Sequence, residues 1–321
     1  MRYFAVLLVS FATFTCAQAQ GWKPDKPVEL VVGAAPGGAN DRIGRSLQRL
    51  LQDGRVNTAV NVVNKPGGGQ SVAFAYLSTH PGNPHYLGLA SSSWLTTVAA
   101  GRGTVTPREL SPIIKLLDEY QMYFVRADSP ITGARDIVER LRKDPASLSF
   151  GISTAAGNPI HISVAETARL AGADPTKIKV VVFNSGTDTA IQVAGGHLDI
   201  GVQSPGSALP LIQSGKLRFI GVAGPRRHGG ALANVPTMRE QGVDVTANVF
   251  YTIFGPRGLD AAQLAFWDDA LANAMKSDAV KKDLAINFWT VDPIGHRELP
   301  AFLERELENY RKTLTAIGMM K

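Results

Sequence analysis

The chain has 321 residues, of which 45% are hydrophobic and 19% charged, a balance typical of a folded globular protein and not of a disordered one. The length is long for one ordinary core and comfortable for two domains. Lysine and arginine exceed aspartate and glutamate by 33 to 27, which gives a formal net charge of +6. The basic residues are scattered, with no block and no interleaved aromatics, so the sequence argues against nucleic-acid binding and modestly favours small anions.

The first nineteen residues have the pattern of a secretory signal. Arg2 precedes an apolar run over residues 3–14 that is too short to span a bilayer, and residues 17–19 read Ala-Gln-Ala, an A-x-A cleavage site. The alternatives are a buried amino-terminal strand, an anchor helix, or lipidation at Cys16. Cys16 is the only cysteine, so the mature chain would have no disulfide, thiol nucleophile or cysteine–metal site. We therefore expect a mature protein that is soluble outside the cytoplasm.

Units of strand, glycine turn and helix fill the first part of the chain. The pattern predicts buried strands over residues 28–32, 60–63 and 86–90, and helices from about residues 41 and 71. Glycine-rich turns follow the first two strands, and residues 91–94, Ser-Ser-Ser-Trp, follow the third. This order is typical of a doubly wound α/β sheet.

A second set of such units begins after residues 122–125. Strands are predicted over residues 148–152, 180–183, 200–202 and 219–222, and helices over residues 158–170 and 186–195. The first of these helices has Asn158 as N-cap and Pro159 at N1. From Asp260, which forms a capping box with Gln263, the chain is predicted to be mostly helical to residue 318. Polar loops thus follow several parallel strands, where open α/β sheets bind ligands.

No pattern of catalytic residues stands out. The glycine turns lack the Lys-Ser/Thr of a P-loop, no G-x-G-x-x-G follows a strand, and the histidines have no H-x-x-x-H spacing for a metal. Residues 201–206 resemble a nucleophile elbow only loosely, and nothing in the sequence brings His161, Asp199 and Ser204 together. We expect a protein without catalysis, cofactor or metal. The alternative is a secreted serine hydrolase that uses Ser204 or Ser153.

Three loops favour an anion-binding site instead. They span residues 36–41, 154–161 and 184–187, and each precedes a helix whose free N–H groups favour an anion. Each loop also carries short polar side chains that could orient a ligand. The alternative is that each loop is a turn and a helix cap only, with His161 supporting its loop from inside the helix.

Five short motifs follow one another along the mature chain, and together they are specific although each is weak alone. They are Pro36-Gly37-Gly38-x-x-Asp41, Asn64-Lys65-Pro66-Gly67, Gly195-Gly196-His197-Leu198-Asp199, Ser214-Gly215-Lys216-Leu217-Arg218, and Val235-Pro236-Thr237 followed by Glu240 and Gly242. The chain thereby resembles the extracytoplasmic solute receptors of the tripartite tricarboxylate transporters, the Bug proteins. The resemblance implies an α/β fold of two domains, the type II-like Venus flytrap of periplasmic binding proteins, with a two-strand hinge.

The resemblance also implies how the chain is divided. Residues 20–123 and 250–321 would form the first domain and residues 124–249 the second, with hinge strands near residues 121–125 and 248–254. We expect a monomer that captures a small organic carboxylate in the cleft between the domains and passes it to membrane permease subunits. The alternative within this class is a receptor that presents its ligand to a sensor kinase.

The expected ligand-binding residues come from the same resemblance. In this family the first-domain loop and the loop after the central second-domain strand hold a ligand carboxylate, partly through ordered water. These loops correspond to residues 34–41 and 154–161, and neighbouring loops complete the cleft. The expected set is Ala34, Ala35, Gly37, Gly38, Asn40, Asp41, Ser92, Trp94, Thr154, Ala155, Asn158, His161, Asn184, Gly186, Thr187, Gln203 and Ser204.

The chain departs from the family pattern at three places. Many relatives carry an aromatic residue where this chain has Ala34 and a tyrosine where it has Asn184, and residues 83–86 replace a common Asp-Gly-Tyr-Thr. Because two bulky walls are missing, we expect a ligand larger than a four-carbon diacid, an aromatic or branched carboxylate, with Trp94 as a stacking face. Alternatively, Trp94 or a loop shift fills the space and the ligand is small.

Overall fold

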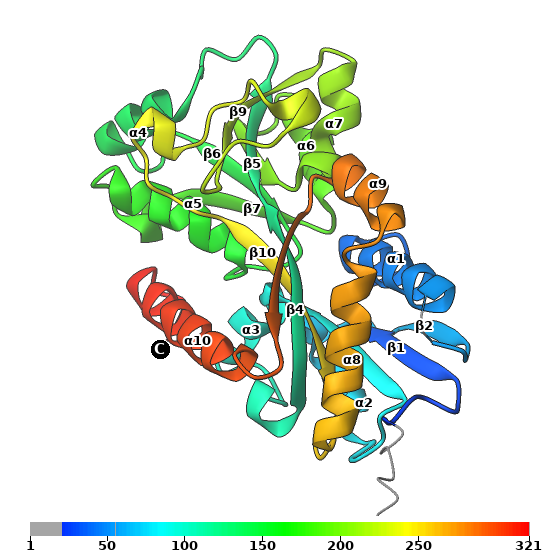
Figure 1. Ribbon diagram of the computed structural model, residues 1–321. Helices are drawn as coiled ribbons and strands as arrows, with labels where there is room; N and C mark the ends of the chain where they lie inside the picture. The colour runs from blue at the N-terminus through cyan, green and yellow to red at the C-terminus, as the bar shows by residue number, and fades with distance from the viewer. Residues whose placement is uncertain (1–20, 55, 321) are drawn as a thin grey trace, which may run out of the picture.

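The computed structural model describes residues 21–54 and 56–320, so the predicted signal sequence over residues 1–19 lies outside the described residues. Figure 1 shows two α/β lobes, each built around one sheet. Sheet A of lobe 1 has the strand order β11 (Thr290–Gly295), β4 (Ser111–Tyr120), β10 (Asn248–Gly255), β3 (Tyr86–Ser91), β1 (Val28–Val32) and β2 (Val60–Asn64). Sheet B of lobe 2 has the order β7 (Lys179–Phe183), β6 (Ser149–Ser153), β8 (Ile200–Gln203), β5 (Met122–Arg126) and β9 (Leu217–Val222).

Both sheets are mixed, so the doubly wound parallel arrangement describes three strands of six in sheet A and three of five in sheet B. In sheet A, β1 pairs in parallel with β2 and β3, whereas β10 runs antiparallel to β3 and β4. In sheet B, β6 pairs in parallel with β7 and β8, whereas β5 runs antiparallel to β8 and β9. The predicted loops follow the parallel strands of each sheet.

Helices cover both sheets. Those of lobe 1 are α1 (Ala39–Gly54), α2 (Ser71–Ser78), α3 (Ser92–Ala99), α8 (Ala261–Ala274), α9 (Asp278–Asn287) and α10 (Leu299–Ala316). Those of lobe 2 are α4 (Ala134–Lys143), α5 (Pro159–Leu170), α6 (Gly186–Ala194) and α7 (Pro205–Gln213). In the part of the chain that the structure describes, none of the helices has the length and apolar character that crossing a membrane requires.

The sequence pattern does not predict two strands of sheet A, and there is a physical reason in each case. The strand β4 is buried but carries charged residues that find partners only in the fold: Lys115 Nζ donates to Asp118 Oδ2 at 2.8 Å, and Glu119 accepts from the Tyr251 hydroxyl at 3.1 Å. The strand β11 is half exposed and its pairing with β4 is interrupted by a register shift. The expectation that residues 260–318 are mostly helical is confirmed by α8, α9 and α10, and β11 is a strand that interrupts these helices.

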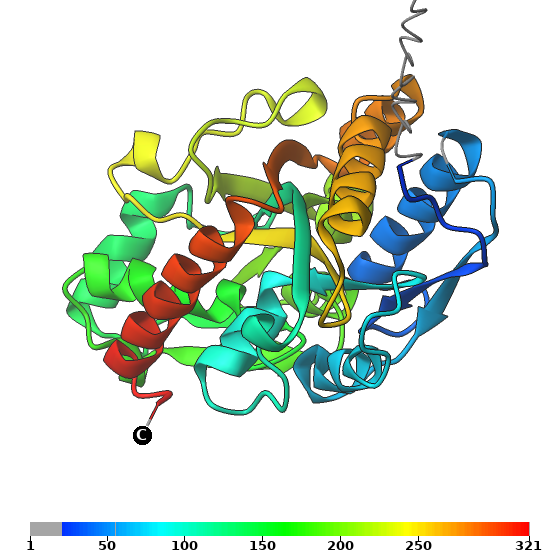
Figure 2. The ribbon, with the colours of Figure 1, turned by 60° about the horizontal axis from the view of Figure 1, so that its bottom comes forward.

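Each lobe has its own hydrophobic core, and a third cluster joins the lobes. The core of lobe 1 includes Trp267 and that of lobe 2 includes Phe150, both 0% exposed. The third cluster contains Leu303 and Leu314 of α10 together with Ala165 of α5. In Figure 2 α10 runs along the side of the molecule next to the helices of lobe 2. Lobe 1 therefore packs against lobe 2 through its carboxyl-terminal helix.

The chain passes between the sheets at Gln121, which separates β4 from β5, and again between β9 and β10. At this point Gln121 N donates to Ala247 O, Ala223 N donates to Gln121 O, and Ala247 N donates to Ala223 O, each at 2.9 Å. Backbone hydrogen bonds thus tie three segments together where the sheets meet. The sheet changes lie within two residues of the expected boundaries at 123/124 and 249/250, which as domain boundaries remain a prediction.

Candidate functional site

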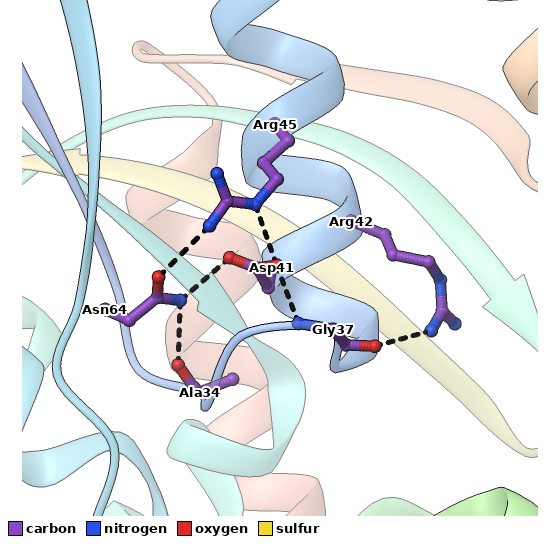
Figure 3. A network of polar contacts seen from close by, with 6 residues as sticks. All are labelled: Ala34, Gly37, Asp41, Arg42, Arg45 and Asn64. Carbon is purple, nitrogen blue, oxygen red and sulfur yellow. Dashed lines mark hydrogen bonds and ion pairs between the residues drawn. The ribbon is translucent and has the colours of Figure 1, made fainter.

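The loop after β1 is held by the carboxylate of Asp41 (Figure 3). Asp41 is 2% exposed; its Oδ2 accepts from Gly37 N at 2.8 Å and from Arg45 Nε at 2.9 Å, and its Oδ1 accepts from Asn64 Nδ2 at 2.8 Å. The same Asn64 nitrogen donates to Ala34 O at 2.9 Å, which ties the loop to the end of β2. Burial alone would raise the pKa of Asp41, but the hydrogen bonds from Arg45, Gly37 and Asn64 outweigh it and leave this pKa below its ordinary value.

The first turn of α1 follows directly on this loop. Among the described residues, the backbone N–H groups of Ala39, Asn40 and Asp41 have no hydrogen-bond partner, as is usual at a helix N-terminus. Gly37 takes a left-handed backbone with φ of +82°, whereas Gly38 does not. The glycine turn therefore opens onto three free donors, while the carboxylate of Asp41 is turned onto its own loop.

Gln70, which the sequence pattern does not single out, links this loop to β3. It lies in the short helical turn η1 (Gly68–Gln70) and is 6% exposed. Its Oε1 accepts from Asn40 Nδ2 and from Ser91 N, both at 3.1 Å, and its Nε2 donates to Ser91 Oγ at 2.6 Å. The signal for it in the sequence is weak: a single amide side chain after three glycines.

Two expected site residues on α3 lie in the interior. Trp94 is 0% exposed, stacked on Phe74 with 4.0 Å between ring centroids and met edge-on by Phe254. The expectation that it offers a stacking face to a ligand is therefore corrected, because its faces pack within the core. Ser92 is also 0% exposed, and its Oγ accepts from Phe250 N at 3.3 Å, so this hydroxyl packs against β10 and does not line an open cleft.

In lobe 2, Asn158 closes the loop after β6. As predicted, it is the N-cap of α5: its Oδ1 accepts from His161 N at 2.9 Å. Its Nδ2 donates to Ser153 O at 2.7 Å and to Thr154 Oγ1 at 2.9 Å. Thr154 has a φ of +73°, a backbone conformation that is unfavourable for a residue with a Cβ. The cap thus also stabilises a strained loop.

His161 supports the same loop from inside α5. Its Nδ1 accepts from Gly157 N at 3.0 Å, so the neutral ring carries its proton on Nε2, for which the described residues offer no partner. His161 is 8% exposed, and burial lowers its pKa to about 4. The ring is therefore neutral at pH 7. Whether Nε2 also meets a ligand remains a prediction.

Gln203 connects the loops after β6, β7 and β8. Its Oε1 accepts from Ser153 Oγ at 2.9 Å, and its Nε2 donates to Thr189 Oγ1 of α6 at 3.1 Å. A Cβ built on Gly186 would lie 3.0 Å from the same Oε1, so the three loops are close together. Gln203 is only 2% exposed, which gives it a supporting place behind the loops.

Of the remaining expected residues, Ser204 is buried and the others are more accessible. Ser204 is 8% exposed, and its Oγ lies 3.1 Å from Ser207 Oγ. The other expected residues are exposed or half buried: Ala34, Ala35, Gly37, Gly38, Asn40, Thr154, Ala155, Asn184, Gly186 and Thr187. Among the described residues, no hydrogen bond joins the expected residues of lobe 1 directly to those of lobe 2. One link beside them runs from Arg102 of lobe 1 to Ala156 O, at 3.4 Å.

The geometry does not assemble a serine hydrolase. Asp199 Oδ2 accepts from the backbone N of Ser149 at 2.8 Å, at the start of β6, whereas Ser153 ends that strand and His161 follows it. A strand of this length separates its two ends by roughly 13 Å. Asp199 therefore cannot orient His161 toward Ser204. Within the residues that the structure describes, no three His, Cys, Asp or Glu side chains are grouped to hold a metal ion.

Two α/β lobes that share two chain crossings, with polar loops at the carboxyl ends of their parallel strands, have the fold of a two-domain periplasmic binding protein. The family model described as "Tripartite tricarboxylate transporter family receptor", TctC, matches residues 44–318, so the chain belongs to this family. It is accordingly a periplasmic solute-binding receptor and not an enzyme.

Relatives and solved structures agree with this assignment. The chain is 27% identical to a UPF0065 protein in the gbd 5' region of Cupriavidus necator, covering 95% of this chain and 92% of the relative. It is 23% identical to protein BugT of Bordetella pertussis, covering 99% and 98%. The fold is similar to that of R. palustris Rpa4515 with adipate (TM-score 0.80, 20% identity, 92% and 98% covered). It is also similar to MatC from Rhodopseudomonas palustris with bound malate (TM-score 0.75, 19% identity, 91% and 99% covered).

Proposed function

We propose that this receptor captures a small organic carboxylate between its lobes and delivers it to the membrane permease subunits of a tripartite tricarboxylate-type transporter. A monomer, exported by a signal sequence over residues 1–19, would suffice for this task. The support is the family, together with two neighbours of the same fold that are described with adipate and malate, both dicarboxylates.

One observation supports the carboxylate site most directly. The first turn of α1 presents the N–H groups of Ala39, Asn40 and Asp41, which favour an anion at the positive end of the helix dipole. An acidic residue in that turn would repel an anion, but the carboxylate of Asp41 is bonded to Gly37 and Arg45. The donors are thus free and the competing charge is balanced. In lobe 2, the loop at residues 154–161 would complete the site.

Gly38 offers the sharpest test of this site. A Cβ at Gly38 would lie 3.2 Å from Ala35 O, which would have to shift by a few tenths of an ångström, while the φ of Gly38 is ordinary. We therefore expect a larger residue to be accommodated by a small shift of the loop and to obstruct the approach of a carboxylate. We expect Gly38→Val to weaken carboxylate binding at least tenfold, about 1.4 kcal/mol. A thermal-shift panel of carboxylates identifies the ligand, and calorimetry measures its affinity. Gly229→Val, at an exposed glycine with open space around it, is the matched control. Wild-type affinity in a folded Gly38→Val protein would show that the glycines serve the turn alone.

The size of the ligand is a separate part of the proposal. The family resemblance implies aromatic side chains in many relatives at the positions of Ala34 and Asn184, so we propose that the smaller residues here make room for a ligand larger than a four-carbon diacid. Because Trp94 is buried, this proposal now depends on the vacated space and not on stacking. Calorimetry with succinate, malate, adipate, benzoate and terephthalate decides it. Ala34→Phe should weaken a bulky ligand and spare a small one; tight binding of succinate with no binding of the larger acids would refute the idea.

A further inference from the structure

Gln70 combines burial, backbone strain and a bridging side chain in one residue. Its φ is +77°, a left-handed conformation that residues with a Cβ rarely adopt, and it is 6% exposed. Neither the core nor the helix that follows requires a glutamine here, since among the residues that the structure describes its side chain bonds to Asn40 and Ser91. Strain of this kind persists where the surrounding structure enforces it, and it is common at binding sites.

The orientation of the Gln70 amide follows from its neighbours. The backbone N–H of Ser91 can only donate, so the atom of Gln70 that faces it at 3.1 Å is Oε1. Asn40 meets the same Oε1 and must therefore present its Nδ2, which turns Asn40 Oδ1 away from Gln70. Gln70 Nε2 then donates to Ser91 Oγ at 2.6 Å. One side chain thus sets the direction of the Asn40 amide.

The backbone around Gln70 is also closely packed. A Cβ on Gly33, the residue that follows β1 and begins the proposed anion-binding loop, would lie 2.7 Å from Gln70 Cβ. The loops that follow β1 and β2 are therefore in direct contact, and Ser91 adds the end of β3. Gln70 lies where these three loops of lobe 1 meet.

We propose that Gln70 is a positioning residue of the carboxylate site. It holds the first turn of α1, through Asn40, in a fixed place relative to the ends of β1 and β3. This role rests on the proposed function, because it assumes that the free N–H groups of α1 meet the ligand. The left-handed backbone at Gln70 places its side-chain amide so that it can bond to Asn40 and Ser91 at the same time, which accounts for the strained conformation.

Two substitutions separate positioning from folding. Gln70→Gly relieves the backbone strain but removes the amide, whereas Gln70→Glu keeps oxygen acceptors for Asn40 and Ser91 N. Gln241→Ala is the matched control: Gln241 bridges Ala134 N at 2.8 Å and Ile220 O at 3.0 Å in lobe 2, away from the expected ligand loops. All variants are first compared by thermal unfolding.

Hydrogen exchange without ligand and calorimetry with malate and adipate are the two measurements. In Gln70→Gly we expect exchange of the Ser91 amide to rise at least tenfold and the affinity for the acid that wild type binds to fall at least tenfold. Gln70→Glu should restore slow exchange at Ser91 but not the affinity, because its carboxylate repels an anionic ligand near the first turn of α1. Gln241→Ala should lower the unfolding temperature with neither change. Adding Asn40→Ala to Gln70→Gly should cost no further affinity than the larger single loss, because the two act as one unit.

Wild-type affinity in Gln70→Gly would overturn the proposal and leave Gln70 a loop residue. Full additivity with Asn40→Ala would equally overturn the route through Asn40. If wild type binds neither malate nor adipate nor any other acid of the panel, the proposed function fails, and with it the role toward a ligand. Exchange at Ser91 then still decides whether Gln70 orders the loops.

Discussion

At the scale of single residues, Asp41 is a buried carboxylate that is paired with Arg45, so removing its charge should destabilise the fold. Asp41→Asn keeps the shape, but it places an NH₂ group where an oxygen accepted and leaves Arg45 without its carboxylate. We expect it to lower the free energy of unfolding by about 1.5–3 kcal/mol at pH 7, the range for hydrogen bonds to a charged group. Urea unfolding of both proteins measures this difference, and equal midpoints would contradict it.

The pH dependence of the unfolding free energy, compared between wild type and Asp41→Asn, gives a second check on Asp41. The pKa of Asp41 in the fold lies below its ordinary value of 3.8, so the unfolded chain takes up the proton first on acidification. The stabilising effect is complete above pH 3.8 and is lost as the pH falls through the lower value in the fold. The gap between wild type and Asp41→Asn should therefore narrow only below pH 3.8.

His161, in contrast to the charged Asp41, is a base that is buried in its neutral form. Its pKa is lowered from 6.5 to about 4 by burial, so between these values the unfolded state binds a proton that the folded state does not. Stability should fall as the pH drops from 6.5 toward 4, by up to about 3 kcal/mol. His161→Gln cannot titrate and should lose this slope, while His228 remains as a common background. Parallel slopes in unfolding experiments at pH 7, 6 and 5 would count against a buried neutral His161.

At the scale of elements, two helix caps of similar chemistry have different consequences. Asn158 caps α5 and also closes the loop at Thr154, whereas Asp260 caps α8 through a capping box with Gln263, outside the expected site. Replacing either by alanine should cost about 1 kcal/mol of unfolding free energy. Only Asn158→Ala should also weaken carboxylate binding, which calorimetry on the two variants decides. Equal affinities would assign Asn158 a capping role alone.

Elements with a local signal could be predicted from the sequence, and those that depend on distant partners could not. The cap of Asn158 and the capping box of Asp260 follow from neighbours three residues away. The strand β4 could not be predicted, because its charged side chains are paired by residues of β10 and β11, far along the chain. The role of Gln70 could not be predicted either, since Asn40 and Ser91 come close to it only in the folded protein. Trp94 was misjudged because stacking with Phe74 depends on how α2 packs on α3.

At the scale of the whole molecule, the three hydrogen-bonded segments at Gln121, Ala223 and Ala247 form the connection about which the lobes would move. Two-domain binding proteins of this design close on their ligands by hinge motion. We expect a smaller radius of gyration with saturating ligand, measured by small-angle X-ray scattering. Ligand at about 100 times its dissociation constant should add roughly 2.7 kcal/mol of apparent stability. Superimposable scattering curves with a ligand verified by calorimetry would indicate rigid lobes.

The place of β10 in sheet A has a consequence for the order of folding. It lies between β3 and β4 and pairs with both, although residues 121–247 separate it from β4 along the chain. All five strands of sheet B are synthesised within that interval, so lobe 2 can form while lobe 1 still lacks a central strand. Until then β3 and β4 each have an unpaired edge, which is open to pairing with another chain. A nascent chain stopped at residue 247 would therefore join a finished lobe to an aggregation-prone one.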